Sequence, residues 1–66
     1  MKLKEWREKK GISQADFAKS LLEFTGKYVS QRTVCSWENN ALPRKFWIKA
    51  IVEITKQKVT VADLAQ

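Results

Sequence analysis

The chain has 66 residues, enough for one small domain, and its net charge of +6 favours an anionic partner. Nucleic acid is the first candidate and a membrane surface the second, although a lysine-rich surface also keeps proteins soluble. Cys35 is the only cysteine, histidine is absent and no glycine-rich phosphate loop occurs, so we expect no enzyme, no catalytic residues, no metal site and no cofactor. No apolar run exceeds three residues, which excludes a membrane span and a signal-peptide core and favours a cytoplasmic protein.

A first helix is predicted over residues 2–10. Leu3 and Trp6 have the i, i+3 spacing of one apolar helix face, and Gly11 can adopt the left-handed conformation that ends a helix. We interpret the charged residues of "KLKEWREKK" as a solvated face with i, i+4 pairs, whose lysines could also reach a nucleic-acid backbone.

A second helix is predicted over about residues 13–25. The Ser13 hydroxyl in "SQAD" can accept hydrogen bonds from the first-turn amides. Apolar residues of helical period follow and form an inward face, namely Phe17, Ala18, Leu21 and Leu22. Phe24 prolongs this apolar content, so we expect the helix to continue past Leu22 to about Phe24 and to stop near Gly26.

A third helix is predicted over about residues 30–39, within "VSQRTVCSWENN". Ser30 is a suitable N-cap, and Val29 could pack against Val34. In helical geometry Val34 and Trp37 lie on one side, which we interpret as the core side. The opposite side is a short polar stripe of Arg32, Ser36 and Asn39, with Cys35 beside them and Gln31 at the edge.

Two further helices complete the chain. Pro43 suits the first turn of a long helix over residues 43–57. Its predicted inward residues are Phe46, Trp47, Ala50, Ile51 and Ile54. A second cap of the S/T-x-x-D type, "TVAD", opens a short helix with Val61 and Leu64. Strand signals are weak, so the sequence predicts an all-α single domain of five helices covering residues 1–66.

The motifs "GISQADFAKSL", "VSQRTVCSWENN", the proline that opens a long helix and "VTVADL" together resemble Cro and the lambdoid phage repressors. This family of DNA-binding domains also includes small bacterial regulators and antitoxins, and the resemblance covers nearly the whole chain. It implies a compact, lambda-repressor-like domain in which the second and third helices form a helix-turn-helix. The third helix would then be the recognition helix in the major groove.

Three residues of the third helix are the predicted base contacts. Arg32 can bond the O6 and N7 atoms of a guanine with its forked guanidinium group. Gln31 can present a donor and an acceptor to adenine, or bond Gln14 across the helix pair as the family pattern implies. Ser36 lies one turn beyond Arg32 and is short enough to let the helix approach closely. The alternative is that these side chains only solvate the helix face.

The resemblance also places Gln14 and Asn39 on phosphates at either side of the groove. Arg44 and Lys45, at the start of the fourth helix, could add phosphate contacts of their own. Two alternatives stay open: Gln14 can be merely a favourable first-turn residue, and Asn39 can simply end its helix.

The connection between the second and third helices departs from the family. Seven residues, "EFTGKYV", separate Leu22 from Ser30, where the family turn takes about three or four. If the second helix runs on, "GKYV" is left as the turn, and Lys27 and Tyr28 would lie near the groove edge, within reach of phosphate. Alternatively, Tyr28 packs over the elongated second helix.

We therefore expect a sequence-specific DNA-binding transcriptional regulator, most simply a repressor that occupies its operator on double-stranded DNA in a bacterial cytoplasm, associated with the nucleoid. The sequence fits a stand-alone Cro-like protein and also the N-terminal domain of a larger repressor. One alternative is an antitoxin that regulates its own promoter and binds a toxin. Another is a basic helical interaction module whose partner is an acidic protein.

The expected assembly is a homodimer on a palindromic operator. One recognition helix covers few base pairs, and family members pair so that two such helices reach successive major grooves about 34 Å apart. Val59, Val61 and Leu64 form the candidate dimer interface, and the alternative is that all three cap the core of the monomer. We expect mostly monomer in dilute solution without DNA.

Overall fold

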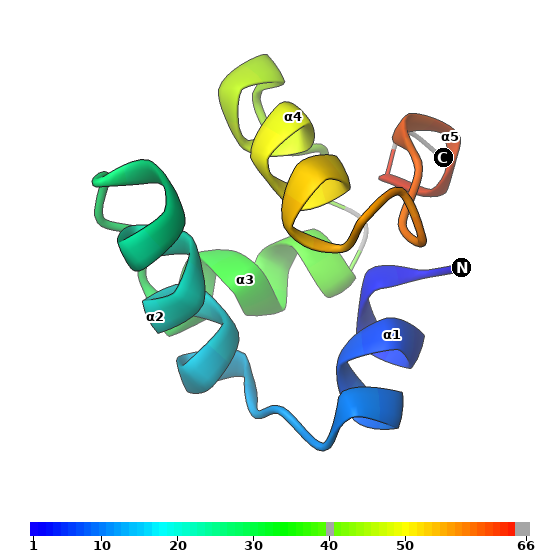
Figure 1. The fold of residues 1–66 in the computed structure, drawn as a ribbon, viewed down its shortest axis with the longest axis horizontal. Coiled ribbons are helices and arrows are strands. Elements are labelled where there is room, and N and C mark those ends of the chain that lie inside the picture. The colour runs from blue at the N-terminus through cyan, green and yellow to red at the C-terminus, as the bar shows by residue number, and fades with distance from the viewer. Residues whose placement is uncertain (40, 65–66) are drawn as a thin grey trace.

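Five helices surround one apolar core in the computed structural model, which describes residues 1–39 and 41–64 (Figure 1). They are α1 (Leu3–Lys10), α2 (Gln14–Thr25), α3 (Gln31–Glu38), α4 (Lys45–Ile54) and α5 (Val61–Leu64). No strand occurs among those residues. The molecule is compact, with principal extents of 25, 25 and 22 Å. The prediction of an all-α fold is confirmed.

Serine hydroxyl groups begin α2 and α3, as the sequence predicts. The Asp16 amide donates to the Ser13 hydroxyl at 3.0 Å, and the Thr33 amide donates to the Ser30 hydroxyl at 3.2 Å. Each serine thereby satisfies an amide that has no partner inside its own helix. The start of α3, and with it the position of every side chain on that helix, is therefore fixed by a local signal.

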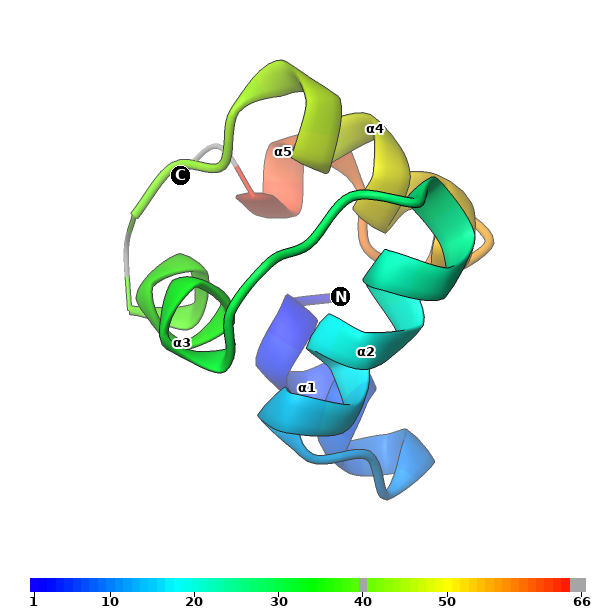
Figure 2. The same ribbon diagram turned by 90° about the vertical axis from the view of Figure 1, so that its left-hand side faces the viewer.

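Glycines end α1 and α2. Gly11 and Gly26 have φ values of 70° and 77°, the left-handed conformation that glycine adopts without steric cost. Because α2 ends only at Gly26, it continues past Leu22 to Thr25, as expected from its apolar content. An extended connection then runs from the end of α2 to α3 (Figure 2).

The fourth helix is shorter than predicted at both ends. Arg44 has an extended backbone (φ −70°, ψ 159°) and is the N-cap, so Pro43 precedes the helix instead of opening it. The helix ends at Ile54, and Lys56 and Gln57 then adopt left-handed φ values of 54° and 67°. Non-glycine residues in this conformation cost roughly 1–2 kcal/mol each, so the turn after α4 is strained.

All five helices contribute to the core. Its buried apolar side chains are Leu3, Phe17, Ala18, Leu21, Val29, Val34, Ala50, Ile51, Val59 and Leu64. The rings of Trp37 and Trp47 lie 5.7 Å apart between centroids and join α3 to α4 at its edge. The inward positions predicted for Val34, Ala50 and Ile51 are confirmed.

Two residues predicted to face inward, Leu22 and Phe46, are exposed instead. Leu22 lies next to the buried arc of α2 but turns outward, because Leu21 already fills the position that faces the core. Phe46 lies in the first turn of α4 and packs edge-on against Trp47, with ring centroids 5.0 Å apart. Val61 opens the short α5, where the inward side belongs to Leu64.

The helix packing gives the molecule two opposite faces. α2 packs against α3 and α4, and α4 packs against α5. Figure 2 shows α3 at one edge of the molecule, seen nearly end-on, and the turn after α4 at the opposite edge. Within the part of the chain that the structure describes, no helix has the length and apolar character needed to cross a membrane.

A buried threonine fixes the turn between α4 and α5. The Thr55 hydroxyl donates to the Ile51 carbonyl at 2.8 Å and accepts from the Val59 amide at 3.2 Å. Both partners are buried. Thr25, at the end of α2, makes the same arrangement with the Lys27 amide, at 3.0 Å, but on the exposed surface.

We therefore predict that Thr55→Val lowers the free energy of unfolding by about 1–3 kcal/mol, because the Val59 amide is left buried without an acceptor. Thr25→Val is the matched control and should cost less, since water can bond the exposed Lys27 amide. Urea denaturation of both variants measures the difference. Equal losses for the two variants would show that burial of the Val59 amide is not the cause.

Candidate nucleic-acid interface

The outer face of α3 carries exposed polar side chains that are not engaged in hydrogen bonds or ion pairs within the described residues. These side chains belong to Gln31, Arg32 and Ser36. On the other side of the helix Val34 is buried and Trp37 packs against the core. The structure thus brings the three predicted base-contact residues together on one accessible surface.

An ion pair beneath this surface holds α3 to α1. Arg7 binds Glu38 with two hydrogen bonds, from Nε to Oε2 at 2.8 Å and from Nη2 to Oε1 at 3.1 Å. The side chains are only 11% and 2% exposed. Arg7 also donates to the Ile12 carbonyl at 2.9 Å, and Gln14 donates to Glu38 Oε1 at 3.0 Å. One carboxylate therefore links α1, the first residue of α2 and the last residue of α3.

The surroundings keep this carboxylate ionised. Burial alone would raise the pKa of Glu38, but hydrogen bonds from Arg7 and Gln14, together with the charge of Arg7, hold it below its ordinary value. The hydrogen bond to Glu38 raises the pKa of Arg7, against the effect of its own desolvation. Both groups are charged at neutral pH, so each depends on the other for compensation.

The sequence interpretation missed this ion pair. "KLKEWREKK" was interpreted as a solvated face, which is wrong for Arg7. Arg7 lies one helical turn after the buried Leu3, and Glu38 lies one turn after the buried Val34. Two opposite charges placed on the core-facing arcs of their helices are a signal from which the pair could have been predicted.

Gln14 and Asn39, the two residues predicted to bind phosphate on either side of α3, differ in exposure. Gln14, predicted to reach phosphate or Gln31, is half-buried and donates to Glu38. Asn39 is exposed and follows the last helical residue, and its side-chain amide donates to the Cys35 carbonyl at 2.9 Å. It thus ends the helix, the alternative considered for it, while it stays accessible.

Exposed residues lie at the beginning of α3 and the beginning of α4. Tyr28 is 75% exposed and lies beside Leu22 of α2, which covers little of its side chain. The Lys27 ammonium lies 4.9 Å from the centroid of the Phe46 ring, a cation–π contact that connects the α2–α3 connection to α4. Arg44 and Lys45 are exposed at the start of α4, as expected for residues that could contact phosphate.

The predicted dimer interface is wrong for two of its three residues. Val59 is completely buried and Leu64 is 8% exposed, both in the core of the protomer. The short α5 needs them as anchors, and the Val59 amide is bonded to Thr55. Val61 alone is exposed. The alternative, that these residues cap the monomer's core, is therefore correct for Val59 and Leu64.

The chemistry of the site comes from its side chains. Residues 1–39 and 41–64 contain no group of three or more side chains suited to hold a metal ion. Comparison of the chain with protein-family models, curated proteins and solved structures found no match. The exposed side chains of α3 offer the forked guanidinium group of Arg32, the amide of Gln31 and the hydroxyl group of Ser36. Arg44 and Lys45 add exposed positive charges at the start of α4.

We predict that Glu38→Gln lowers the free energy of unfolding at pH 7 by about 3 kcal/mol, since Arg7 is left buried without an anion. The pKa of Glu38 is depressed in the folded state. Its stabilisation is therefore complete above the ordinary value of 4.5 and is lost as the pH falls through the lower folded value. Urea denaturation between pH 7 and pH 3 should show the curves of wild type and variant converging.

Two further variants control this experiment. Glu23→Gln removes an exposed carboxylate from α2 and should change stability little. The double variant Arg7→Met/Glu38→Leu removes both charges together and should recover most of the loss. A Glu38→Gln deficit that is the same at pH 7 and pH 3 would contradict the assignment of this stabilisation to the ion pair.

Proposed function

We propose that the protein is a sequence-specific DNA-binding transcriptional regulator in which α2 and α3 act as a helix-turn-helix and α3 is the recognition helix. The observation that carries this proposal is the free polar face of α3, supported from beneath by the buried ion pair of Arg7 and Glu38. The resemblance to Cro and the lambdoid repressors and the net charge of +6 support it further.

The three exposed residues of α3 suit the edges of base pairs. The major groove of B-DNA admits one α-helix, and the residues near the start of that helix meet the bases. Arg32 would bond the O6 and N7 atoms of a guanine, and Gln31 would bond an adenine. Ser36, one turn further, adds a hydroxyl group and leaves room for close approach. This set provides both donors and acceptors, as discrimination between base pairs requires.

Phosphate contacts would fix the position of α3 in the groove. Arg44 and Lys45 lie at the start of α4, and Lys27 and Tyr28 precede α3, so donors flank the recognition helix. Asn39 would add a contact at the other end of α3. Gln14 keeps one amide hydrogen beyond its bond to Glu38, which could be donated to a phosphate.

The simplest mode of action is repression by occupancy of a palindromic operator, in the cytoplasm of a bacterial host and on its nucleoid. Two protomers would place their copies of α3 in successive major grooves about 34 Å apart. Pairing is needed because one domain of this size buries too little surface on DNA for tight binding. Of the residues first considered for the interface, Val61 is the one that could meet the second protomer.

The test begins with selection of the best-bound sequence from a random duplex pool. On that site Arg32→Ala should cost about 1–3 kcal/mol of binding free energy and relax the preference at one base position. Arg44→Ala, which removes an equal charge outside α3, should weaken binding to all sequences alike and reduce the salt dependence. An Arg32→Ala protein with its full site preference would show that another residue reads the sequence.

The stoichiometry of the complex tests the proposed pairing. We predict two protomers on a selected site with two-fold symmetry, and mostly monomer without DNA, because DNA adds the linkage that a small interface lacks. Sedimentation of the saturated complex measures the ratio. One protomer at saturation on a site without symmetry would contradict the proposed dimer. The proposed base contacts would be unaffected, because the Arg32→Ala experiment tests them separately.

A further inference from the structure

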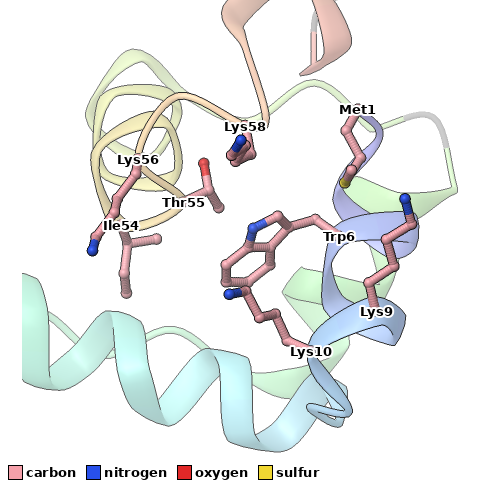
Figure 3. Close-up of a pocket in the computed structure, with 8 residues that line it drawn as sticks. All are labelled: Met1, Trp6, Lys9, Lys10, Ile54, Thr55, Lys56 and Lys58. Atoms are coloured by element: carbon pink, nitrogen blue, oxygen red, sulfur yellow. The ribbon is translucent and has the colours of Figure 1, made fainter.

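A pocket opens between α1 and the turn after α4 (Figure 3). That turn lies at the edge of the molecule opposite α3 (Figure 2). Its volume is about 430 Å³, within the range of sites that hold small molecules. Trp6 lies in its middle, and four lysine side chains surround it, Lys9 and Lys10 from α1 and Lys56 and Lys58 from the turn.

The four lysines form no ion pair within residues 1–39 and 41–64, although Lys9 also lies beside Glu5 and Glu8 on the outer side of α1. No carboxylate of these residues lines the pocket. Two lysines come from each side of the pocket: Lys10 and Lys58 end beside Trp6, and Lys9 and Lys56 stand further out on opposite sides of it (Figure 3). A group with several negative charges bound beside Trp6 would attract these exposed, flexible side chains.

The indole ring of Trp6 is held in place but remains available. It packs against Phe17 in a T-shaped contact, with ring centroids 5.9 Å apart and an angle of 68° between the planes. The Lys10 ammonium lies 5.9 Å from the indole centroid. The ring is only half-buried, and its N–H makes no hydrogen bond within the described part of the chain. The pocket therefore offers an aromatic surface and a free donor.

The strained turn contributes to this arrangement. Lys56 and Gln57 both have positive φ values, which side chains of this kind rarely adopt. The buried hydroxyl group of Thr55 holds the turn from within, and Lys56 and Lys58 stand at the pocket as a result. Strained backbone that survives in a folded protein is concentrated at functional sites.

We propose that this pocket binds a nucleoside polyphosphate, with its base stacked on Trp6 and its phosphates held by Lys9, Lys10, Lys56 and Lys58. Stacking on an aromatic side chain combined with lysine contacts to phosphate is how proteins hold unpaired nucleotides. Duplex DNA fits this pocket poorly, because its bases are stacked within the helix and only its phosphates could reach the lysines. The occupied pocket would leave α3 free.

Titration of the whole protein with adenosine 5′-triphosphate at low salt tests the proposal. Calorimetry gives the affinity, and the indole N–H resonances report which tryptophan is affected. We expect saturable binding with one ligand per chain and a shift of the Trp6 signal, with the Trp37 and Trp47 signals little changed. Adenosine and inorganic tripolyphosphate are the matched probes, and each should bind at least about tenfold more weakly, since each lacks one half of the contacts.

Variants of exposed lysines leave the core intact. Lys10→Gln/Lys56→Gln should weaken binding of the triphosphate roughly tenfold, and the double variant Lys19→Gln/Lys49→Gln, outside the pocket, should bind it as the wild type does. Trp6→Leu should abolish the preference for the triphosphate over tripolyphosphate, with circular dichroism as the check on folding.

Several outcomes would overturn the proposal. They are the absence of binding at millimolar triphosphate, equal binding of tripolyphosphate, or equal weakening by the Lys19/Lys49 control. Tighter binding of a short single-stranded oligonucleotide at Trp6 would also overturn it, because the ligand would then be a nucleic-acid strand. The titration contains no DNA duplex, so its result is independent of the function proposed for α3.

Discussion

The ion pair between Arg7 and Glu38 is the constraint on which the arrangement of the helices depends. The pair links α1 to the end of α3, and Gln14 at the start of α2 donates a hydrogen bond to the same carboxylate. Both charges are buried, so neither helix can shift without leaving one of them uncompensated. Burying two charges costs desolvation free energy. We infer that the role of the pair is to hold α3 in a single defined position.

This constraint explains how α3 keeps its orientation despite the extended connection that precedes it. The chain between Gly26 and Ser30 is extended (Figure 2), and it is anchored by the buried Val29 and by the contact of Lys27 with Phe46. The contact of Gln14 with Glu38 and the burial of Val34 set the angle between α2 and α3 at the other end of the helix pair. The orientation of the outer face of α3 is then fixed by the buried contacts of Glu38 and Val34 on the inner side of the helix. The polar residues of the outer face are not needed to hold the helix in place.

The sequence predicted the features that depend on neighbouring residues and failed where distant residues compete. Ser13, Ser30 and Gly26 fix helix ends through bonds within a few residues, and the structure confirms them. The Arg7–Glu38 pair spans 31 positions, so helical periodicity places each charge on the core-facing arc of its helix but does not specify that the two meet. Local periodicity likewise could not show that Val59 and Leu64 are buried in the core of their own protomer. The exposed stripe of α3 was predictable because it needs only helical geometry.

We propose that the free face of α3, held by the buried ion pair, is the surface that reads DNA. Nuclear magnetic resonance of the isotope-labelled protein, titrated with its best selected duplex, tests this claim most directly. We predict that the largest changes fall on the amide and side-chain signals of Gln31, Arg32 and Ser36, while the indole signal of Trp6 in the lysine-lined pocket stays unchanged. Changes centred on Trp6 and the lysines around it, with the α3 signals unmoved, would show that DNA does not bind at α3.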